Sequence, residues 1–460
     1  MGPDGGILRT EDIVEEAKQG TESVHDEVVR IAQAAKAASA ELAQTSTEQR
    51  NAALYAMAAA LRDNAAEIIE ANEQDMEAAR EKGTKESLLD RLMLNDKRLE
   101  DMALALESLA ELPDPLGRVL EERTLESGIE LKRVSVPLGV VAIVYEARPN
   151  VTADAAGICL KSGNAAVLRG GSLAAHSNEV TSRVLHDAAV AAGMPKGCIG
   201  AITSTDHAAT DELMQLHGTV DVLIPRGGAG LIRHCVENSK VPVIETGSGN
   251  CHVYVNETAD QDMALSIVMN AKCRRYGVCN AEEKLLVDES IADEFLPKML
   301  ASLARKGVLL HCDEHASACA QKALEDEANA DLRGVMRVEP ATEVDWETEY
   351  SAPEIGVKCV SGVDEAIDHI NRYGTKHSEA IVADEDSPEG EAAIEAFLAR
   401  VDAAAVYANA PTSWTDGGMF GLGAEIGIST QKLHVRGPFA LEGLTSSKYV
   451  LRGKGQVRPL

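Results

Sequence analysis

Cys279 lies in the segment "RRYGVCNAEE", residues 274–283, directly after a Gly-Val step and shortly after Arg274 and Arg275. A thiol attacks only as the thiolate, which cationic neighbours and helix ends favour. The alternative for any cysteine is an inert thiol that fills the core. Three other cysteines fit that alternative, because they lie within apolar helix or strand patterns: Cys159, Cys198 and Cys359. Cys279 instead follows a glycine at a predicted break between helix and loop, so both interpretations stay open for it at this point.

Two polar residues follow predicted strands. Asn150 comes directly after Pro149, just past the strand "GVVAIVYEA". Its amide can donate to a developing oxyanion, or it can cap a helix that begins at Thr152. Glu245 ends the predicted strand "VPVIE" beside a domain boundary, and the alternative for it is a solvated strand end.

Two glycine-rich turns, "LRGGS" (168–172) and "IPRGGAG" (224–230), each follow a predicted strand and precede a predicted helix. Ligands bind at such places in an open parallel sheet, where backbone N–H groups hold phosphates. Arg169 and Arg226 add positive charge. Neither turn is a G-x-G-x-x-G fingerprint or a P-loop, and glycines also serve plain tight turns. Two such turns in successive units, each beside an arginine, favour a dinucleotide.

Most of the chain after residue 138 repeats a strand–turn–helix rhythm, with a boundary near residues 245–250. Continuous apolar strands that alternate with helices predict parallel sheets covered on both faces. The strands predicted after the boundary are residues 282–290, 355–362, 379–385 and 403–410.

Two further segments, 119–136 and 446–460, are strand-like in a different way. The first alternates charged and branched residues around Ser127-Gly128, which predicts a hairpin. Exposed strands of this kind pair either with each other or with a second subunit.

Length and composition narrow the class of protein. A chain of 460 residues is expected to form two or three domains. No apolar run is long enough to span a bilayer, and the first twenty residues lack the pattern of a secretion signal. The opening "MGPDGG" is expected to be a disordered lead-in.

The cysteines and the net charge exclude other classes. None of the nine cysteines forms a C-x-x-C pair, so we expect no metal site, no disulfide framework and a reducing cytoplasm. The formal net charge of −30 argues against nucleic acid as a partner. It indicates either an ordinary acidic enzyme surface or adaptation to high salt.

Several long motifs, taken together, resemble one known family: "VYEARPNVTADA", "LKSGNAAVLRGG", "IPRGG", "VIETGSGNCHVYVN", "VCNAEE" and "TDGGMFGLGAEIGISTQKLHVRGP". They are similar to the glutamate-5-semialdehyde dehydrogenases, also called gamma-glutamyl phosphate reductases, a branch of the aldehyde dehydrogenase superfamily. The resemblance covers roughly residues 30 to 455, in order. It implies an aldehyde dehydrogenase-like α/β fold.

The resemblance also implies a division of the chain and an oligomer. A Rossmann-type cofactor domain is expected at 1–118 and 139–246, and an α/β catalytic domain at 247–436. A small β element for oligomerisation is expected at 119–138 and 437–460, within a homodimer or a dimer-based tetramer.

The family's site residues carry over position by position. Cys279 matches the nucleophile, Asn150 the oxyanion-hole amide and Glu245 the glutamate at the strand end before the nucleophile. Glu349, in "WETEYSAP", matches the acid that contacts the nicotinamide ribose. The remaining cofactor residues lie in the two glycine turns: Arg169, Gly170, Gly171 and Ser172, then Pro225, Arg226, Gly227 and Gly228.

The implied reaction is the NADPH-dependent reduction of L-glutamyl 5-phosphate to the semialdehyde and phosphate, in proline biosynthesis. It passes through a thioester on Cys279, which no water attacks. Glu245 therefore needs no role as a base, and manages protons, orients the cofactor or is structural. The choice of NADP over NAD rests on the family alone.

Two departures from the family pattern concern substrate binding. Arg275-Tyr276-Gly277 replaces the usual lead-in to the nucleophile, and Ser413 stands where an arginine is common. Arg274 or Arg275 is expected to compensate, and a Ser413→Arg variant with a lowered KM would support this. Two alternative functions are an aldehyde dehydrogenase that releases an acid, with Glu245 as base, and a nucleotide-binding pseudoenzyme.

Overall fold

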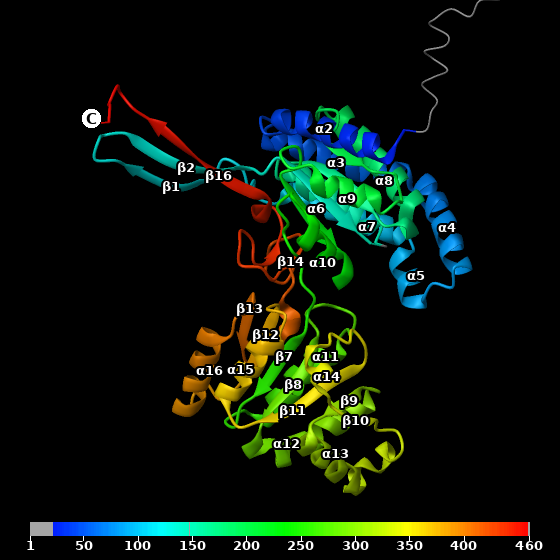
Figure 1. Cartoon of the computed structure of the whole chain (residues 1–460), viewed down its shortest axis with the longest axis vertical. Coiled ribbons are helices and arrows are strands. Elements are labelled where there is room, and N and C mark those ends of the chain that lie inside the picture. The colour runs from blue at the N-terminus through cyan, green and yellow to red at the C-terminus, as the bar shows by residue number, and fades with distance from the viewer. Residues whose placement is uncertain (1–21, 147, 459–460) are drawn as a thin grey trace, which may run out of the picture.

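The computed structural model describes residues 22–146 and 148–458, so the "MGPDGG" lead-in lies outside the described residues. The chain forms two lobes and a ribbon of strands that projects from the upper lobe (Figure 1). The first helices of the upper lobe are α2 (Val24–Leu42), α3 (Thr47–Asp63), α4 (Ala65–Glu81), α5 (Glu86–Leu92) and α6 (Asp96–Glu111). Ser23, Ser46 and Asn95 begin α2, α3 and α6, because each side chain accepts a hydrogen bond from a backbone N–H three residues later.

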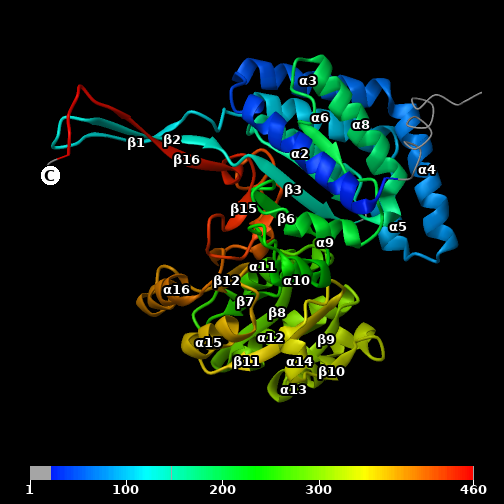
Figure 2. The same ribbon diagram turned by 45° about the horizontal axis from the view of Figure 1, so that its top comes forward.

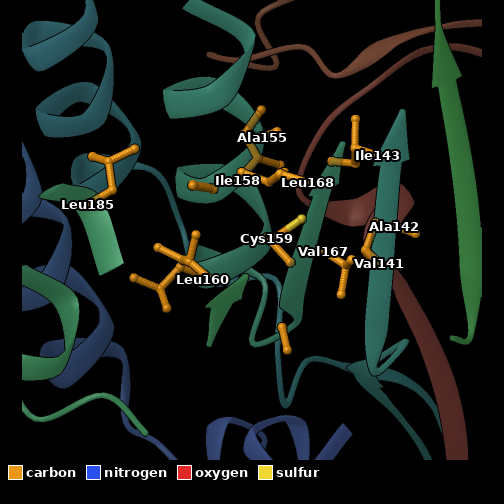
Figure 3. Close-up of a cluster of buried hydrophobic side chains, with 14 of the residues drawn as sticks. Val141, Ala142, Ile143, Ala155, Ile158, Cys159, Leu160, Val167, Leu168 and Leu185 are labelled. Carbon is orange, nitrogen blue, oxygen red and sulfur yellow. The ribbon is translucent and has the colours of Figure 1, made fainter. Parts of the chain in front are cut away.

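The upper lobe contains a parallel sheet in the strand order β5-β4-β3-β6. Its strands are β3 (Val140–Tyr145), β4 (Ala165–Gly170), β5 (Ile199–Ala201) and β6 (Val222–Arg226). The helices between and after them are α7 (Asn150–Lys161), η2 (Ser172–Ala174), α8 (Ala175–Ala191), α9 (Ala208–Gln215) and α10 (Ala229–Asn238). Every residue of β3 is buried, as expected for a strand covered on both faces. Cys159 lies in this core among Val141, Val167 and Leu168, which confirms it as a packing residue (Figure 3).

The lower lobe contains a seven-stranded parallel sheet in the order β10-β9-β11-β8-β7-β12-β13. Its strands are β7 (Cys251–Val255), β8 (Glu282–Asp288), β9 (Leu309–Cys312), β10 (Val338–Pro340), β11 (Glu354–Val360), β12 (Ser378–Val382) and β13 (Ala405–Ala408). Its helices are α11 (Gln261–Cys273), α12 (Glu289–Arg305), α13 (Glu314–Glu325), η3 (Glu327–Leu332), α14 (Glu343–Glu347), α15 (Val363–Tyr373), α16 (Pro388–Arg400) and η4 (Thr412–Trp414). The four strands predicted after residue 250 are therefore confirmed.

The strand predicted at "VPVIE" is wrong. The segment makes a single parallel bridge, between Val243 and Leu223 of β6. Pro242 lacks an N–H and so donates nothing to a ladder. The chain then crosses towards the C-terminal region, where Thr246 forms an isolated antiparallel bridge with Ser429. Glu245 therefore lies on a connecting segment and not at the end of a regular strand.

The projecting ribbon has three antiparallel strands in the order β1-β2-β16, and it is seen along its length in Figure 2. Its strands are β1 (Val119–Thr124), β2 (Glu130–Pro137) and β16 (Thr445–Arg452). The predicted hairpin is confirmed, and the C-terminal segment pairs with it. A smaller pair, β14 (Gly427–Ser429) and β15 (Gly437–Phe439), and the short η5 (Glu442–Leu444) lie before β16. Among the described residues, no helix is long and apolar enough to cross a membrane.

Candidate active site

The loop that carries Cys279 joins α11 to β8 and lies where the two lobes meet (Figure 1). Seven of the nine cysteines are buried, whereas Cys279 and Cys273 are partly exposed. Gly249 packs directly against this loop: a Cβ there would lie 1.4 Å from the carbonyl oxygen of Cys279. The thiol of Cys251 donates to the same carbonyl over 3.2 Å. Residues at the start of β7 and just before it, Cys251 and Gly249, therefore hold the backbone of Cys279 in place.

Asn280, the residue after Cys279, anchors the loop to the C-terminal region. The Nδ2 of buried Asn280 donates to the carbonyls of Thr415 (2.9 Å) and Ser413 (3.3 Å), and the hydroxyl of Thr412 donates back to the Asn280 carbonyl. Ser413 itself is buried, and its hydroxyl donates to Asn270 of α11 over 2.8 Å. Ser413 thus helps to hold the loop in place.

Several arginines cluster around Arg148, and two of them, Arg148 and Arg226, act electrostatically on Cys279. Burial lowers the pKa of Arg148, and so do the neighbouring charges of Arg226, Arg91 and Arg275, while Cys279 opposes them. Arg148 precedes α7, Arg226 ends β6 and Arg275 belongs to the nucleophile loop, so the two lobes both contribute. None of these four arginines forms an ion pair with a carboxylate within the described residues. Arg226 lies near the carboxyls of Glu425 and Asp154 without forming a close ion pair, and guanidinium groups that are free of such pairs suit an anion.

Asn150 lies at the mouth of a pocket between the end of β3, the start of α7 and the C-terminal region. The pocket is lined by Ile143, Arg148, Asn150, Val151, Asp154, Ala155, Arg226, Glu425 and Ile426. Asn150 is the first residue of α7 and Pro149 precedes it as the N-cap, so the capping alternative is wrong. Its Nδ2 donates to Asp154 over 3.1 Å, and burial raises the pKa of Asp154 to about 6. The amide is exposed and available at the pocket that also contains Arg226.

Burial raises the pKa of Cys279 to about 11. Arg226 opposes this shift, whereas the charges of Glu425 and Glu349 add to it. Burial also raises the pKa values of both carboxyls; a hydrogen bond from the backbone of Gly249 opposes the shift in Glu349, and one from Gly417 opposes it in Glu425. At neutral pH the thiol is protonated, so attack requires a group that takes its proton.

The structure brings Glu349 to the electrostatic surroundings of Cys279, but Glu245 is not among the charges that act most strongly on the thiol. Glu245 is half-buried, and its backbone N–H donates to the side chain of Gln431 over 3.0 Å. Glu425 and Arg148 were missed by the sequence analysis. Both lie inside the motifs "FGLGAEIG" and "VYEARPN" quoted there, but no rule of spacing singles them out.

The first glycine turn borders a pocket at the carboxyl ends of β4 and β5. Gly170 packs against Asn178, since a Cβ there would lie 2.0 Å from the Asn178 Nδ2. The Nδ2 of Asn178 and the hydroxyl of Ser182 line this pocket, and both are buried without a hydrogen-bond partner in the described structure. Such orphaned polar atoms fit the adenosine part of a dinucleotide. Gly171 and Ser172 complete the turn before η2.

Arg169 and the second glycine turn already form hydrogen bonds within the protein. Arg169 is buried, and its guanidinium donates to the carbonyls of Thr205 and Asp206. In the second turn, the backbone N–H of Gly228 donates to the carboxylate of Glu146 over 3.0 Å, and a Cβ on Gly227 would collide with that side chain. The helix start at Gly228 is therefore an anion site that an internal carboxylate fills. Pro225 lies buried in β6, where its carbonyl accepts from Thr246 over 2.6 Å.

This arrangement, a Rossmann-type sheet that faces a cysteine loop across two lobes, defines the aldehyde dehydrogenase class. The sequence profile of the aldehyde dehydrogenase family matches residues 9–323. The chain belongs to that family.

Comparison with individual relatives assigns the chain to one branch of the aldehyde dehydrogenase family. It is 53% identical to the gamma-glutamyl phosphate reductase of Moorella thermoacetica, over 94% of this chain and 99% of the relative. It is 50% identical to that of Halothermothrix orenii, over 95% of this chain and 99% of the relative. The crystal structure of the gamma-glutamyl phosphate reductase of Thermotoga maritima superposes with a TM-score of 0.89 at 43% identity, covering 94% of this chain and all of that one. Within the family, the chain belongs to the gamma-glutamyl phosphate reductases.

Proposed function

We propose that this protein catalyses the NADPH-dependent reduction of L-glutamyl 5-phosphate to L-glutamate 5-semialdehyde and phosphate, a step of proline biosynthesis. The observation that carries this proposal is the cluster of arginines around Arg148, of which Arg148 and Arg226 act on Cys279, in a chain whose relatives are reductases of this name. The substrate brings a phosphate and a carboxylate, which guanidinium groups bind better than any other side chain.

The binding roles follow from position. Arg148 and Arg226, on the upper wall, and Arg275, on the nucleophile loop, hold the two anionic groups of the substrate. Of the two arginines expected to compensate for Ser413, Arg275 is the one within the arginine group. Glu425 lines the same pocket as Arg226.

The chemistry begins with the thiol. Cys279 gives its proton to a nearby carboxylate, for which Glu349 and Glu425 are suited because burial raises their pKa values. The thiolate then attacks the acyl carbon, while the Asn150 amide and the Cys279 backbone N–H hold the developing oxyanion. The C–O bond to phosphate breaks, phosphate leaves among the arginines, and a thioester remains on Cys279. A bound nicotinamide cofactor would supply a hydride to the thioester carbon, and breaking of the C–S bond would then release the aldehyde and return Cys279 as the thiolate.

The cofactor residues are those of the first turn and its pocket. Gly170, Gly171, Ser172 and Asn178 lie beside the adenosine, and Glu349 lies beside the nicotinamide ribose, close to the reacting carbon. The N–H groups of Gly227 and Gly228 become available to the pyrophosphate when Glu146 moves away. Arg169 supports this pocket through the 205–206 backbone.

The division into domains, the oligomeric state and the cellular location are also proposed from the resemblance to the family. Residues 1–118 and 139–246 form the cofactor domain, 247–436 the catalytic domain, and 119–138 with 437–460 the oligomerisation element. The exposed apolar residues Tyr449 and Leu451 on β16 suit a contact with a second subunit in a dimer or tetramer. The protein acts in the cytoplasm on a small-molecule substrate, without nucleic acid, metal or membrane as a partner in this reaction.

The experiment that tests the function is the reverse reaction. Purified protein is assayed with the semialdehyde, with and without inorganic phosphate, and with NADP⁺ or NAD⁺. We expect turnover that requires phosphate, prefers NADP⁺ and is absent in Cys279→Ser. Phosphate-independent release of glutamate would instead identify an aldehyde dehydrogenase that hydrolyses its thioester. No turnover under any condition would identify a nucleotide-binding protein without catalysis.

A further inference from the structure

Helices α12 and α13 bring together three side chains at the end of the lower lobe far from the nucleophile (Figure 1). Asp293 lies on α12, and His315 and Cys319 lie four positions apart on α13, where they share one face. One ligand atom from each residue lies within 4.8 Å of the other two. No residue of this cluster has a part in the chemistry at Cys279.

Two of the three distances between ligand atoms are close to those of a tetrahedral metal site. The Oδ1 of Asp293 is 3.7 Å from the Nε2 of His315 and 3.7 Å from the Sγ of Cys319. Tetrahedral zinc, with bonds of about 2.0–2.3 Å, sets its ligand atoms about 3.3–3.6 Å apart. The thiol has only long contacts otherwise, at 3.6 Å to the carbonyl of Ala292. Small rotations of the three side chains are enough to enclose an ion.

The donor set selects the class of ion. A thiolate and an imidazole disfavour Mg²⁺ and Ca²⁺, which take oxygen ligands, and favour zinc and its tetrahedral analogues. The thiolate and the carboxylate together neutralise a divalent charge. The side chain of Asp293 is 74% exposed and that of His315 is 36% exposed, so the ion has a path from solvent and a place for a water as fourth ligand.

We propose that Asp293, His315 and Cys319 form a site for a zinc-type divalent cation that clamps α13 to α12. The sequence predicted no metal site, because its cysteines form no C-x-x-C pair and these three ligands come from two helices. The site lies beyond one end of β8 and Cys279 lies before the other, so about 20 Å of strand separates them. The clamp is therefore structural and independent of the proposed reaction.

The test uses the full chain carrying Cys279→Ser, so that the partly exposed thiol of Cys279 adds no signal. After chelator treatment the protein is titrated with Co²⁺, and we expect one equivalent to produce tetrahedral d–d bands and a thiolate-to-cobalt charge-transfer band. Adding His315→Ala or Cys319→Ser should abolish both bands. His234→Ala, which removes a histidine paired with Asp211 on the upper lobe, is the matched control and should keep them.

Two further measurements complete the test. Zn²⁺ at about a hundredfold excess over its dissociation constant should raise the melting temperature by about 5 °C in the Cys279→Ser protein and by nothing in its His315→Ala derivative. With Cys279 intact, His315→Ala should leave turnover unchanged. Absence of Co²⁺ binding, or bands that survive both His315→Ala and Cys319→Ser, would overturn the proposal.

Discussion

The two parallel sheets of this protein bury very different side chains. In the upper sheet, β3 is apolar throughout, and its neighbours add aliphatic residues and Cys159 (Figure 3). In the lower sheet, the first three residues of β8, Glu282, Glu283 and Lys284, are all completely buried. Glu283 forms an ion pair of 3.0 Å with Lys272, and both side chains are shielded from solvent.

The difference shows that the protein accommodates buried charged side chains in the strand that follows the Cys279 loop. An ion taken out of water costs several kcal/mol unless it is paired or neutralised. Burial raises the pKa of Glu283 to about 7 and lowers that of Lys284 to about 7, so charge is reduced as well as paired. The charged layer begins three residues after Cys279. In the lower sheet a central strand thus begins with buried charged residues, whereas β3, a central strand of the upper sheet, buries apolar residues throughout.

The largest contrast is between two cysteines. Cys279→Ser should lower activity by about 10⁴-fold or more while the melting temperature stays the same, because only the nucleophile is lost. Cys159→Ser should do the reverse: turnover within a factor of two, and a free energy of unfolding lower by about 1–3 kcal/mol, because a hydroxyl enters an apolar core. Steady-state assays and denaturant titrations measure both. If Cys279→Ser kept as much activity as Cys159→Ser is expected to keep, Cys279 would have no part in the mechanism.

Two buried lysines test the electrostatic contrast. Lys272→Met leaves Glu283 without its partner and should destabilise the protein by about 3–5 kcal/mol. The matched variant in the upper lobe is Lys161→Met, whose lysine donates to the neutral oxygens of Asn51 and Ala110. It should cost only about 1–2 kcal/mol. Urea titrations compare the two, and similar losses would mean that the lower lobe does not depend on its charges.

Arg226 should set the reactivity of the nucleophile. A thiol with a pKa of about 11 reacts about tenfold faster for each unit of pH between 7 and 9, as its thiolate fraction grows. Arg226→Gln removes the cation that lowers this pKa, so the pKa rises and alkylation at fixed pH should slow by about tenfold. The control is Arg274→Gln, which should change the rate little. Iodoacetamide labelling followed by mass spectrometry gives the rates, and a flat pH profile would contradict the pKa.

Salt should produce the smallest effect, and it acts on both lobes. The chain has 74 acidic and 44 basic residues, so surface repulsion is screened by added ions. Molar potassium chloride should raise the melting temperature by about 2–5 °C and preserve activity. The buried Lys272–Glu283 pair is little screened, so Lys272→Met should show the same salt increment. No gain from molar salt would end the hypothesis of adaptation to high salt.

Much of the fold was predictable because its strands are apolar and its turns carry glycine. The strands of the upper sheet, four of the seven strands of the lower sheet and the hairpin at 119–136 were predicted from pattern, and β16 was predicted as a strand with two possible partners. The strands β7, β9 and β10 were not predicted. "VPVIE" was misread because its apolar pattern suits a strand, while Pro242 and the crossing to the other lobe prevent a ladder. The capping role offered for Asn150 failed because α7 begins at Asn150 itself.

By itself, the sequence determined the family and most of the strands, and the family resemblance selected Cys279 among nine cysteines as the predicted nucleophile. Only the tertiary structure decided which charges surround that thiol, because Arg148, Arg226, Glu349 and Glu425 are remote in sequence and meet through folding. It also decided the pKa values, since these depend on burial and on the distance between charges. The zinc-type cluster on α12 and α13 has the same origin: its ligands become a set only when two helices pack together.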